Sequence, residues 1–399
     1  MKEKMKSFFS DTIWSIAGLM LMNVVAQFVV YPAWSRRLGS ENYGDILYLM
    51  SILNIVAISM GSGTNYARMT KAADENVSNA PYLVCMMVVT LLSIPFAFIV
   101  RAVGGVPMSV LDCILFALLL CATMWRFYAD VEYRLSLNYR GYFLYYLVIS
   151  VGYGIGVLLM NATGLWSLAL LPGELFGLLL VALKGKILKL PSDASKTVYK
   201  EVTKIVLIMF GTNVISNIVF NGDRILLKVL LDGTAVTTYY LASLLGKTMS
   251  LITTPLNSVI VGYLAKYEKG LSKKMVGWIT LACAVVSLLV TIACTIASYI
   301  LIPILYPVEY EMVKVYFFLA NLAQVLFFVG NVITVLLLRF ADAKYQLYVN
   351  VFYAVAFVAL CVPATWMAGV WGFCAALLLT CLLRLIYALW LCYNTVKNK

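Results

Sequence analysis

Long runs of apolar residues limit the folds open to this chain more than any other feature of its sequence. A helix of about 20 apolar residues crosses the roughly 30 Å hydrocarbon core of a membrane. Irregular backbone is not stable against lipid, so such runs indicate helices. The sequence therefore predicts an all-α polytopic membrane protein with about twelve transmembrane helices, at residues 11–34, 43–66, 81–104, 109–129, 141–160, 164–184, 203–230, 235–263, 275–303, 313–339, 345–367 and 370–393.

The composition excludes the other broad classes. Hydrophobic residues make up 63% of the chain and charged residues 12%, whereas a soluble domain has about 45–50% and about 25%. An outer-membrane barrel is excluded because its strands alternate polar and apolar residues. The first apolar run is long and is followed by Arg36-Arg37, so we expect a helix there and not a cleaved signal peptide.

The basic residues are distributed unevenly along the chain. The 30 lysines and arginines outnumber the 18 acids and give a net charge of +12. If the N-terminus is cytoplasmic, most of them fall on the cytoplasmic side, including the basic stretch at 184–204. This bias predicts an even number of spans with both termini in the cytoplasm. The positive charge is then a sign of topology, and no nucleic-acid partner is expected.

The basic stretch divides the chain into two sets of six spans. A shift of 193 residues pairs residues 38–49 with residues 231–242, where each stretch breaks after a long helix. Such repeats are typical of transporters that rock around a central cavity. We therefore predict two pseudo-symmetric six-helix lobes, residues 1–190 and 191–399, around a central cavity. One chain holds both lobes, so a monomer is expected.

Histidine, the commonest general acid or base in enzymes, is missing from the chain. The chain has no histidine, and its nine cysteines lie in apolar runs without a C-x-x-C motif. Histidine catalysis, a metal site and a disulfide framework are therefore not expected. The loops are also too short for an extramembrane catalytic region. The chain is predicted to be no enzyme and to need no cofactor, apart from a coupling H⁺ or Na⁺.

Two glycine patterns are informative. The spacing Gly152-x-x-x-Gly156 predicts a face for close helix packing. The sequence Gly61-Ser62-Gly63-Thr64 lacks the lysine and the spacing of a P-loop. ATP hydrolysis is therefore not indicated.

Two acids within predicted spans are candidates for ion coupling. Glu174 lies near the middle of the sixth segment, where Pro172 and Gly173 could open the helix. An acid at this depth is costly, which favours a proton or cation site; the alternative is a protonated acid that serves packing. Asp223 precedes Arg224 in the seventh segment. It is the second candidate, with a local ion pair or a membrane-edge anchor as the alternatives.

Lys247 lies well inside the eighth segment. Polar residues at helical spacing share its face: Ser243, Ser250, Thr254 and Asn257. A polar stripe of this kind favours an aqueous cavity over lipid. Lys247 is therefore a candidate for binding an anionic group such as a phosphate. Snorkelling of the side chain to the interface is the alternative.

The seventh segment carries amides every four residues. Asn213, Asn217 and Asn221 recur at this spacing, and Arg224 follows. Amides both donate and accept hydrogen bonds, which suits sugar hydroxyls. The alternative is that they bind neighbouring helices.

The first segment has a similar polar set. Asn23 and Gln27 precede Arg36, which the shift of 193 residues places beside Lys228. Two basic positions at equivalent helix ends could flank the mouth of a cavity. Anchoring at the membrane interface is the alternative.

A resemblance to a known family rests on two groups of motifs. The opening runs from Ser10-Asp11-Thr12-Ile13-Trp14 to Pro32-x-x-x-Arg36-Arg37-Leu38-Gly39-x-x-x-Tyr43-Gly44. The second group is Asn221-Gly222-Asp223-Arg224 with Tyr239-Tyr240-Leu241-Ala242. Together they resemble the Wzx-type polysaccharide flippases. These belong to the superfamily that also contains the MATE exporters and the lipid II flippases.

The resemblance implies a flippase of the bacterial plasma membrane. Its substrate would be an oligosaccharide on a polyprenyl pyrophosphate, moved by ion-coupled alternating access for surface polysaccharide biosynthesis. Membrane lipid and other polysaccharide-assembly membrane proteins would be its partners. As a hypothesis, the pyrophosphate is bound by basic residues, the sugar by amides, and the coupling ion by an acid. The basic residues are Lys247, Arg36 and Arg224. The amides are those of Asn213, Asn217, Asn23 and Gln27. The acid is Glu174 or Asp223.

Two other functions compete with this one. A MATE-like exporter of small molecules or drugs shares the twelve-span plan. A cationic drug would favour an acidic cavity, however, whereas the charges placed in this one are mainly basic. A membrane-embedded polysaccharide enzyme is the weaker alternative because the chain lacks histidine and large loops.

Overall fold

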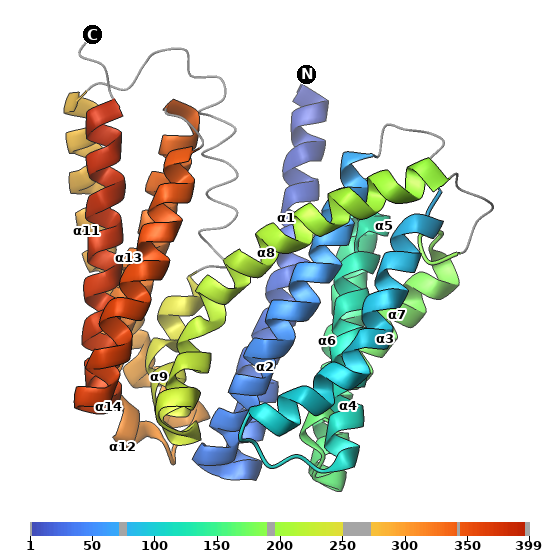
Figure 1. The fold of residues 1–399 in the computed structure, drawn as a ribbon, viewed down its shortest axis with the longest axis horizontal. Coiled ribbons are helices and arrows are strands. Elements are labelled where there is room, and N and C mark those ends of the chain that lie inside the picture. The colour runs from blue at the N-terminus through green and yellow to red at the C-terminus, as the bar shows by residue number, and fades with distance from the viewer. Residues whose placement is uncertain (1, 72–77, 190–195, 250–272, 341–343, 396–399) are drawn as a thin grey trace. The chain divides into compact units, whose positions relative to one another are not determined.

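The chain folds into helices throughout the part that the structure describes. A computed structural model describes residues 2–71, 78–189, 196–249, 273–340 and 344–395, and every regular element within these ranges is helical (Figure 1). Eight helical stretches there are long and apolar enough to cross a membrane, and Ile13–Thr70 and Tyr345–Asn394 each cover two predicted spans. The predicted all-α polytopic fold is confirmed. The elements are α1 (Lys2–Val25), η1 (Ala26–Val30), α2 (Tyr31–Thr70), α3 (Ala80–Val103), α4 (Val110–Ala129), α5 (Val131–Leu135), α6 (Tyr139–Thr163), η2 (Trp166–Ala169), α7 (Leu171–Lys184), α8 (Lys196–Leu230), α9 (Gly233–Thr248), α11 (Lys273–Leu305), α12 (Tyr310–Val313), η3 (Lys314–Tyr316), α13 (Phe317–Phe340) and α14 (Lys344–Thr395).

Two long helices break where the sequence predicts a boundary between spans. The backbone of α2 leaves the helical conformation at Gly39, with φ 79° and ψ 168°. The backbone of α14 does so at Ala368 and at Gly369, where φ is 56°. A positive φ costs glycine little because it has no Cβ. The breaks fall between the predicted segments 11–34 and 43–66, and between 345–367 and 370–393.

The sixth predicted span differs from the expected helix. Gly164 ends α6 in the left-handed conformation, and the short 3₁₀ helix η2 precedes α7. The 14 residues of α7 give a length of about 21 Å. Pro172 lies in its first turn, where a missing N–H costs nothing. The expectation that Pro172 and Gly173 open the middle of a helix is therefore wrong, because they begin one.

The chain forms two compact units. Unit 1 comprises Met1–Gly39 and Asp45–Ile225, and unit 2 comprises Ser40–Gly44 and Leu226–Lys399. In unit 1, α6 packs on α1 and α7, and α4 packs on α3 and α7. In unit 2, α13 packs on α9, α11 and α14. The units divide within α8, whereas the lobe boundary at 190/191 was drawn from the repeat and stays a prediction.

Glycines allow the close packing inside unit 1. A Cβ at Gly152 would collide with the backbone of Gly173, and one at Gly156 with the carbonyl of Ala169. The predicted close-packing face on α6 thus lies against η2 and α7. A Cβ at Gly61 of α2 would likewise collide with the carbonyl of Met124 in α4. These contacts bring α2, α4, α6 and α7 close enough for their polar side chains to meet.

The segment Ser40–Gly44 belongs to unit 2 although it lies within α2. The ring of Tyr43 stacks on Tyr306, with centroids 6.0 Å apart, and lies edge-on to Tyr240. The Thr237 hydroxyl donates to the carbonyl of Ser40 over 2.6 Å. A Cβ at Gly44 would collide with the carbonyl of Gly233. The Leu38-Gly39 and Tyr43-Gly44 pairs therefore mark where the chain enters unit 2 and leaves it.

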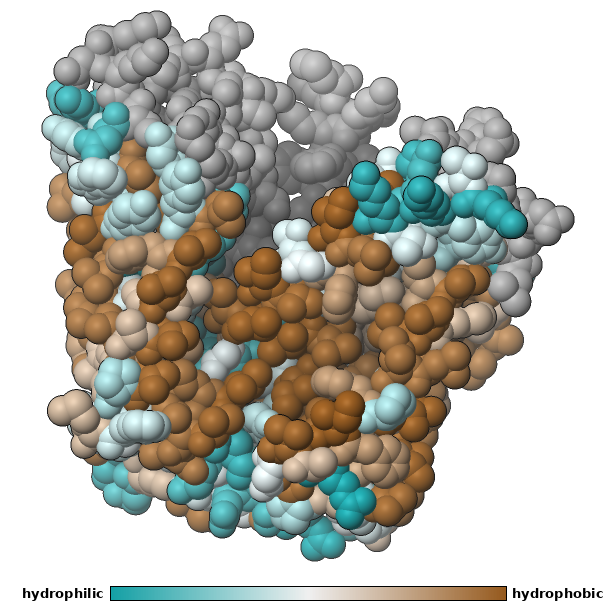
Figure 2. All heavy atoms as spheres, viewed as in Figure 1, coloured by the Kyte–Doolittle hydropathy of each residue, from teal (hydrophilic) through white to brown (hydrophobic). Residues whose placement is uncertain are grey.

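The surface of each unit is apolar along the middle of its helices. On the face in Figure 2, hydrophobic side chains cover these middle parts and hydrophilic side chains gather at the helix ends. Large apolar side chains are widely exposed, among them Leu91 (70%), Leu158 (69%) and Leu289 (61%). Such a surface is stable only against lipid, as expected of a multi-pass membrane protein.

Candidate functional site

A buried ion pair joins α4 to α7 in unit 1. The Arg126 Nε of α4 lies 2.6 Å from the Glu174 Oε2 of α7, and both side chains are almost fully buried. The other carboxylate oxygen, Oε1, accepts a hydrogen bond of 2.6 Å from the Tyr153 hydroxyl of α6. Both oxygens of Glu174 are thus bound. Three helices that are far apart in sequence meet at this carboxylate.

The local sequence explains why Glu174 sits at this point. It lies in the first turn of α7, where the helix dipole favours a negative charge. A Cβ at the preceding residue, Gly173, would collide with the ring of Tyr153. Glycine at this position thus allows Tyr153 to approach α7 and to reach the carboxylate.

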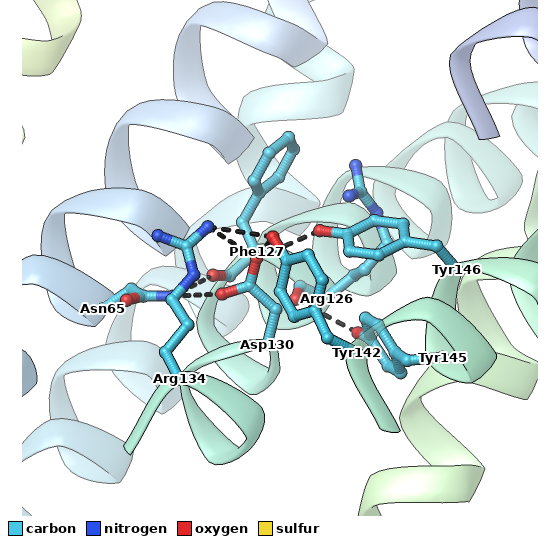
Figure 3. A network of polar contacts seen from close by, with 8 residues as sticks. All are labelled: Asn65, Arg126, Phe127, Asp130, Arg134, Tyr142, Tyr145 and Tyr146. Carbon is cyan, nitrogen blue, oxygen red and sulfur yellow. Dashed lines mark hydrogen bonds and ion pairs between the residues drawn. The ribbon is translucent and has the colours of Figure 1, made fainter. Parts of the chain in front are cut away.

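A second buried acid, Asp130, lies one turn beyond Arg126 (Figure 3). Its Oδ2 accepts hydrogen bonds from the Arg134 Nη2 at 3.1 Å, from the Tyr146 hydroxyl at 3.0 Å and from the Tyr142 hydroxyl at 3.3 Å. Its Oδ1 accepts a very short hydrogen bond from the Asn65 amide of α2. The acid is 1% exposed. This set of donors satisfies a buried carboxylate and fixes α2, α4 and α6 to one another.

The two clusters are continuous along α4. The Tyr145 hydroxyl donates to the carbonyl of Arg126, and the Asn65 amide donates to that of Phe127 (Figure 3). Glu174 pairs with Arg126 and Asp130 with Arg134, so the charges of these two clusters balance. We call these residues the unit 1 polar network: Asn65, Arg126, Asp130, Arg134, Tyr142, Tyr145, Tyr146, Tyr153 and Glu174.

Most of this network was missed in the sequence, where only Glu174 was singled out. Arg126 and Arg134 were counted as signs of topology. Two features could have revealed them. Arg126, Asp130 and Arg134 recur every four residues on one helix face, and three tyrosines follow at 142, 145 and 146.

The amides of α8 contact α2. Figure 1 shows α8 crossing α2 obliquely. The amide of Asn217 donates to the Ser59 hydroxyl over 3.1 Å, and that of Asn213 to the Ser59 carbonyl over 3.5 Å. Asn217 and Asn221 also donate to backbone carbonyls one turn earlier in α8. These are contacts of the kind that the helix-binding alternative predicts. Sugar binding by Asn213 and Asn217 stays a prediction.

Asp223 and Arg224 are buried side by side in α8. They are 6% and 7% exposed. The Asp223 Oδ1 accepts from the backbone N–H of Arg224, and the Arg224 Nη1 lies 3.5 Å from the Ser51 hydroxyl of α2. Burial of both side chains argues against an anchor at the water interface.

The polar residues of the first segment lie in α1, η1 and α2. The Asn23 amide donates to the carbonyl of Leu19 in its own helix. Gln27 lies in the π-helix η1 (Ala26–Val30), a turn type common at functional sites. Arg36 is exposed in α2. Their proposed contacts with substrate stay predictions.

Lys247 lies in the last turn of α9 in unit 2 and is 7% exposed. Its Nζ lies 5.9 Å from the ring centroid of Tyr239, whose hydroxyl accepts a hydrogen bond of 2.6 Å from the Gln324 amide of α13. The Asn321 Oδ1 accepts from the backbone N–H of Gly246 over 2.7 Å. The predicted polar neighbours Ser250, Thr254 and Asn257 lie outside the described residues. Ser243, the remaining one, is fully buried.

A second buried cation, Arg384 of α14, also lies in unit 2. It is 3% exposed. Its Nη2 donates to the Asn331 Oδ1 over 2.7 Å, and its Nη1 donates to the Phe327 carbonyl over 3.0 Å. The guanidinium also lies 4.6 Å from the Phe327 ring centroid. Within the described residues, no acid pairs with this arginine.

The candidate residues are thus divided between the units. Arg36, Arg224, Glu174, Asp223 and the four amides lie in unit 1, and Lys247 lies in unit 2. In the described parts of the chain, no three His, Cys, Asp or Glu side chains group in a way that could hold a metal ion.

Solved transporter structures share this fold. An inward-facing MATE-family multidrug resistance transporter of the MOP superfamily matches with a TM-score of 0.69 and 13% identity, over 96% of this chain and 99% of that one. A MOP-superfamily transporter from Pyrococcus furiosus matches with a TM-score of 0.63 and 14% identity, over 98% and 97%. The lipid II flippase MurJ matches with a TM-score of 0.62 and 13% identity, over 95% and 87%. No known family and no curated protein matches the chain by sequence. At these identities the likeness establishes the fold that MATE transporters and MurJ share.

Proposed function

We propose that this protein is a flippase for a polyprenyl-pyrophosphate-linked oligosaccharide in the bacterial plasma membrane. The fold supports the proposal because it occurs both in MATE transporters and in a lipid II flippase. The two termini would lie in the cytoplasm, as the positive-inside bias predicts. The protein would act as a monomer beside other polysaccharide-assembly membrane proteins and would alternate access to the two sides of the membrane.

The observation that carries the proposal is the charge of the interior of unit 2. Its buried Asp, Glu, Lys and Arg side chains, among the described residues, are Lys247, Arg384 and Glu309. The Glu309 carboxylate accepts a hydrogen bond from Ser40, and no described acid pairs with Arg384. Buried cations are costly in a membrane protein and are retained where function needs them. An excess of positive charge favours an anionic cargo such as a pyrophosphate.

The remaining roles follow from the chemistry of the side chains. Lys247, Arg36 and Arg224 would attract the pyrophosphate, and Asn213, Asn217, Asn23 and Gln27 would bind sugar hydroxyls. Glu174 or Asp223 would couple transport to H⁺ or Na⁺. Glu174 is supported by its burial beside Arg126, because protonation of the carboxylate would release the arginine and loosen α4 from α7.

The first prediction concerns transport itself. Deletion of the gene should trap the undecaprenyl-linked repeat unit in the cytoplasmic leaflet and abolish the surface polysaccharide. The purified protein in proteoliposomes should also expose a labelled lipid-linked oligosaccharide to an external glycosidase when an ion gradient is applied. Unchanged lipid-linked intermediates in the deletion strain would overturn the proposal.

The second candidate function is a MATE-like small-molecule exporter. It is favoured by the TM-score of 0.69 to a multidrug MATE transporter. The Pyrococcus furiosus transporter is described as having a binding pocket of reverse polarity that suggests a different function, so this fold serves more than one kind of cargo. New drug sensitivity with normal glycans after deletion would support this candidate in place of the flippase.

A further inference from the structure

An apolar groove lies on the surface of unit 1 between α4 and α7. Its volume is about 510 Å³, and every residue that lines it is apolar. Pockets that hold drug-sized ligands measure about 300–1,000 Å³. The lining residues used below are Trp125 of α4, Leu175, Phe176, Leu179 and Ala182 of α7, and Leu188 in the loop after α7.

Two leucines that line this groove are exposed, and a hydrogen bond fixes the ring of Trp125. Leu175 is 48% exposed and Leu179 is 55% exposed. The indole N–H of Trp125 donates to the Thr90 hydroxyl over 2.8 Å, which fixes the ring at the rim. In a membrane protein, a groove of this kind is filled by a hydrocarbon chain, because water would be unfavourable there.

One end of the groove meets a cluster of lysines. Lys184 ends α7, two residues after Ala182, and Lys186 and Lys189 flank Leu188 within two residues. All three are exposed, and none forms an ion pair with a described residue. This loop lies on the side that the charge bias assigns to the cytoplasm. Because this loop follows a predicted span, we place it at the level of the lipid head groups, where each lysine contributes about 1 kcal/mol of attraction to anionic lipids.

The loop that carries the lysines has a defined backbone. The Glu132 Oε2 accepts hydrogen bonds of 2.8 Å from the backbone N–H groups of both Lys186 and Ile187. The side chain of Ile187 is 3% exposed. The N–H of Gly185 donates to the Val181 carbonyl over 2.7 Å. Glu132 thus holds the backbone of the described part of this loop, where the side chains of the three lysines are exposed.

We propose that this groove binds an anionic membrane phospholipid, with one acyl chain between α4 and α7 and its phosphate on Lys184, Lys186 and Lys189. Apolar walls and an adjacent basic loop match the two ends of such a lipid. A zwitterionic lipid fills the groove equally well but gains less from the lysines. The site is independent of the proposed flippase activity, since it needs no transported substrate.

The lipid would also brace the unit 1 polar network. Trp125 and Leu175 in the wall are the immediate sequence neighbours of Arg126 and Glu174. A chain packed between α4 and α7 would hold these two helices at the separation that the ion pair requires. Bound lipid is therefore expected to raise the melting temperature of the protein.

Binding can be measured without any transport assay. The delipidated full-length protein is titrated with phosphatidylglycerol or phosphatidylcholine and followed by native mass spectrometry. We expect the wild-type protein to hold one phosphatidylglycerol molecule tightly. The triple variant Lys184→Gln/Lys186→Gln/Lys189→Gln should lower the affinity for phosphatidylglycerol at least about tenfold. The matched control is Lys196→Gln/Lys200→Gln/Lys204→Gln, which removes the same charge from exposed lysines of α8 outside the groove and should leave the affinity within about twofold.

A second variant tests the acyl chain separately from the charges. Ala182→Trp fills the groove, keeps all the lysines and should abolish the tight site. Equal affinity for the two lipids in the wild type, or wild-type binding by Ala182→Trp, would overturn the proposal. Stoichiometric displacement of phosphatidylglycerol by polyprenyl phosphate would also overturn it, because the groove would then belong to the tail of the transported substrate.

Discussion

At the scale of single residues, the unit 1 polar network shows how a membrane protein can bury Arg126, Asp130 and Glu174, with Arg134 partly exposed beside them. Arg126 pairs with Glu174, and Arg134 pairs with Asp130. Tyrosine hydroxyls supply further donors to both acids. A buried pair of this kind is costly to break because the surviving partner is left as an isolated charge in a medium of low dielectric.

The second prediction follows from this pair. Glu174→Gln should lower the free energy of unfolding of the purified protein in detergent by about 3 kcal/mol, because Arg126 loses its counter-charge. The double variant Arg126→Met/Glu174→Leu should recover much of that loss, because no charge remains unpaired. Tyr153→Phe, which keeps the pair and removes one hydrogen bond, should cost only about 1 kcal/mol. Equal losses for Glu174→Gln and Tyr153→Phe would show that the ion pair does not stabilise the fold.

The third prediction concerns Lys247. If it binds the pyrophosphate, Lys247→Ala should lower the flipping rate in proteoliposomes at least about tenfold, because a charge-assisted contact is lost. Lys247→Arg keeps the charge and should retain more of the rate. The control is Lys314→Ala, which removes a 38% exposed lysine paired with Glu311 in the same unit. Undiminished flipping by folded Lys247→Ala would refute the assigned role.

At the scale of helices, backbone contacts at glycine decide where elements meet. Gly39 turns the chain out of the helix, and Gly44 lets the backbone of α2 touch that of Gly233 at the start of α9. The shift of 193 residues pairs residues 38–49 with residues 231–242. Parts of these two stretches therefore contact each other within unit 2, where Ser40 and Gly44 meet Thr237 and Gly233.

The fourth prediction tests this contact. Gly44→Ala places a Cβ on the carbonyl of Gly233 and should destabilise the protein by about 1–3 kcal/mol through overpacking. Gly211→Ala is the matched control, because Gly211 is also helical and has open space at its Cβ position. It should be neutral or slightly stabilising, since alanine favours helix. The melting temperatures of the two variants in detergent give the comparison.

Element types were predictable from the sequence, but the site was largely not. Hydropathy alone locates the helices, because a lipid-exposed span must be apolar for about 20 residues. Glu174 was recognisable as a costly acid within a span. Its partner Arg126 was not recognisable, because the sequence does not distinguish a charge at the end of a span that faces water from one that faces a buried acid. Tyr153 and Asn65 join the network through glycine contacts between distant helices, which no local pattern reveals.

At the scale of the whole molecule, the two units differ in their buried charge. Among the described residues, unit 1 buries Arg126 and Arg224 with four acids, Asp45, Asp130, Glu174 and Asp223, whereas unit 2 buries Lys247 and Arg384 with Glu309. The fold of MATE transporters and MurJ is compatible with either kind of cargo. The proposal of an anionic, lipid-linked cargo therefore rests on the charge of unit 2 and on the motifs of the sequence.

The packing of Ser40–Gly44 within unit 2 also has a consequence for biosynthesis. These five residues leave the ribosome early, yet their packing partners Gly233, Tyr240 and Tyr306 emerge much later. Domains of most proteins fold as they are made, N-terminal first. Tyr43 of α2 can therefore gain its ring contacts with Tyr240 and Tyr306 only after α9 and α11 have been synthesised. Assembly of unit 2 therefore includes a step that joins an early segment of the chain to segments made much later.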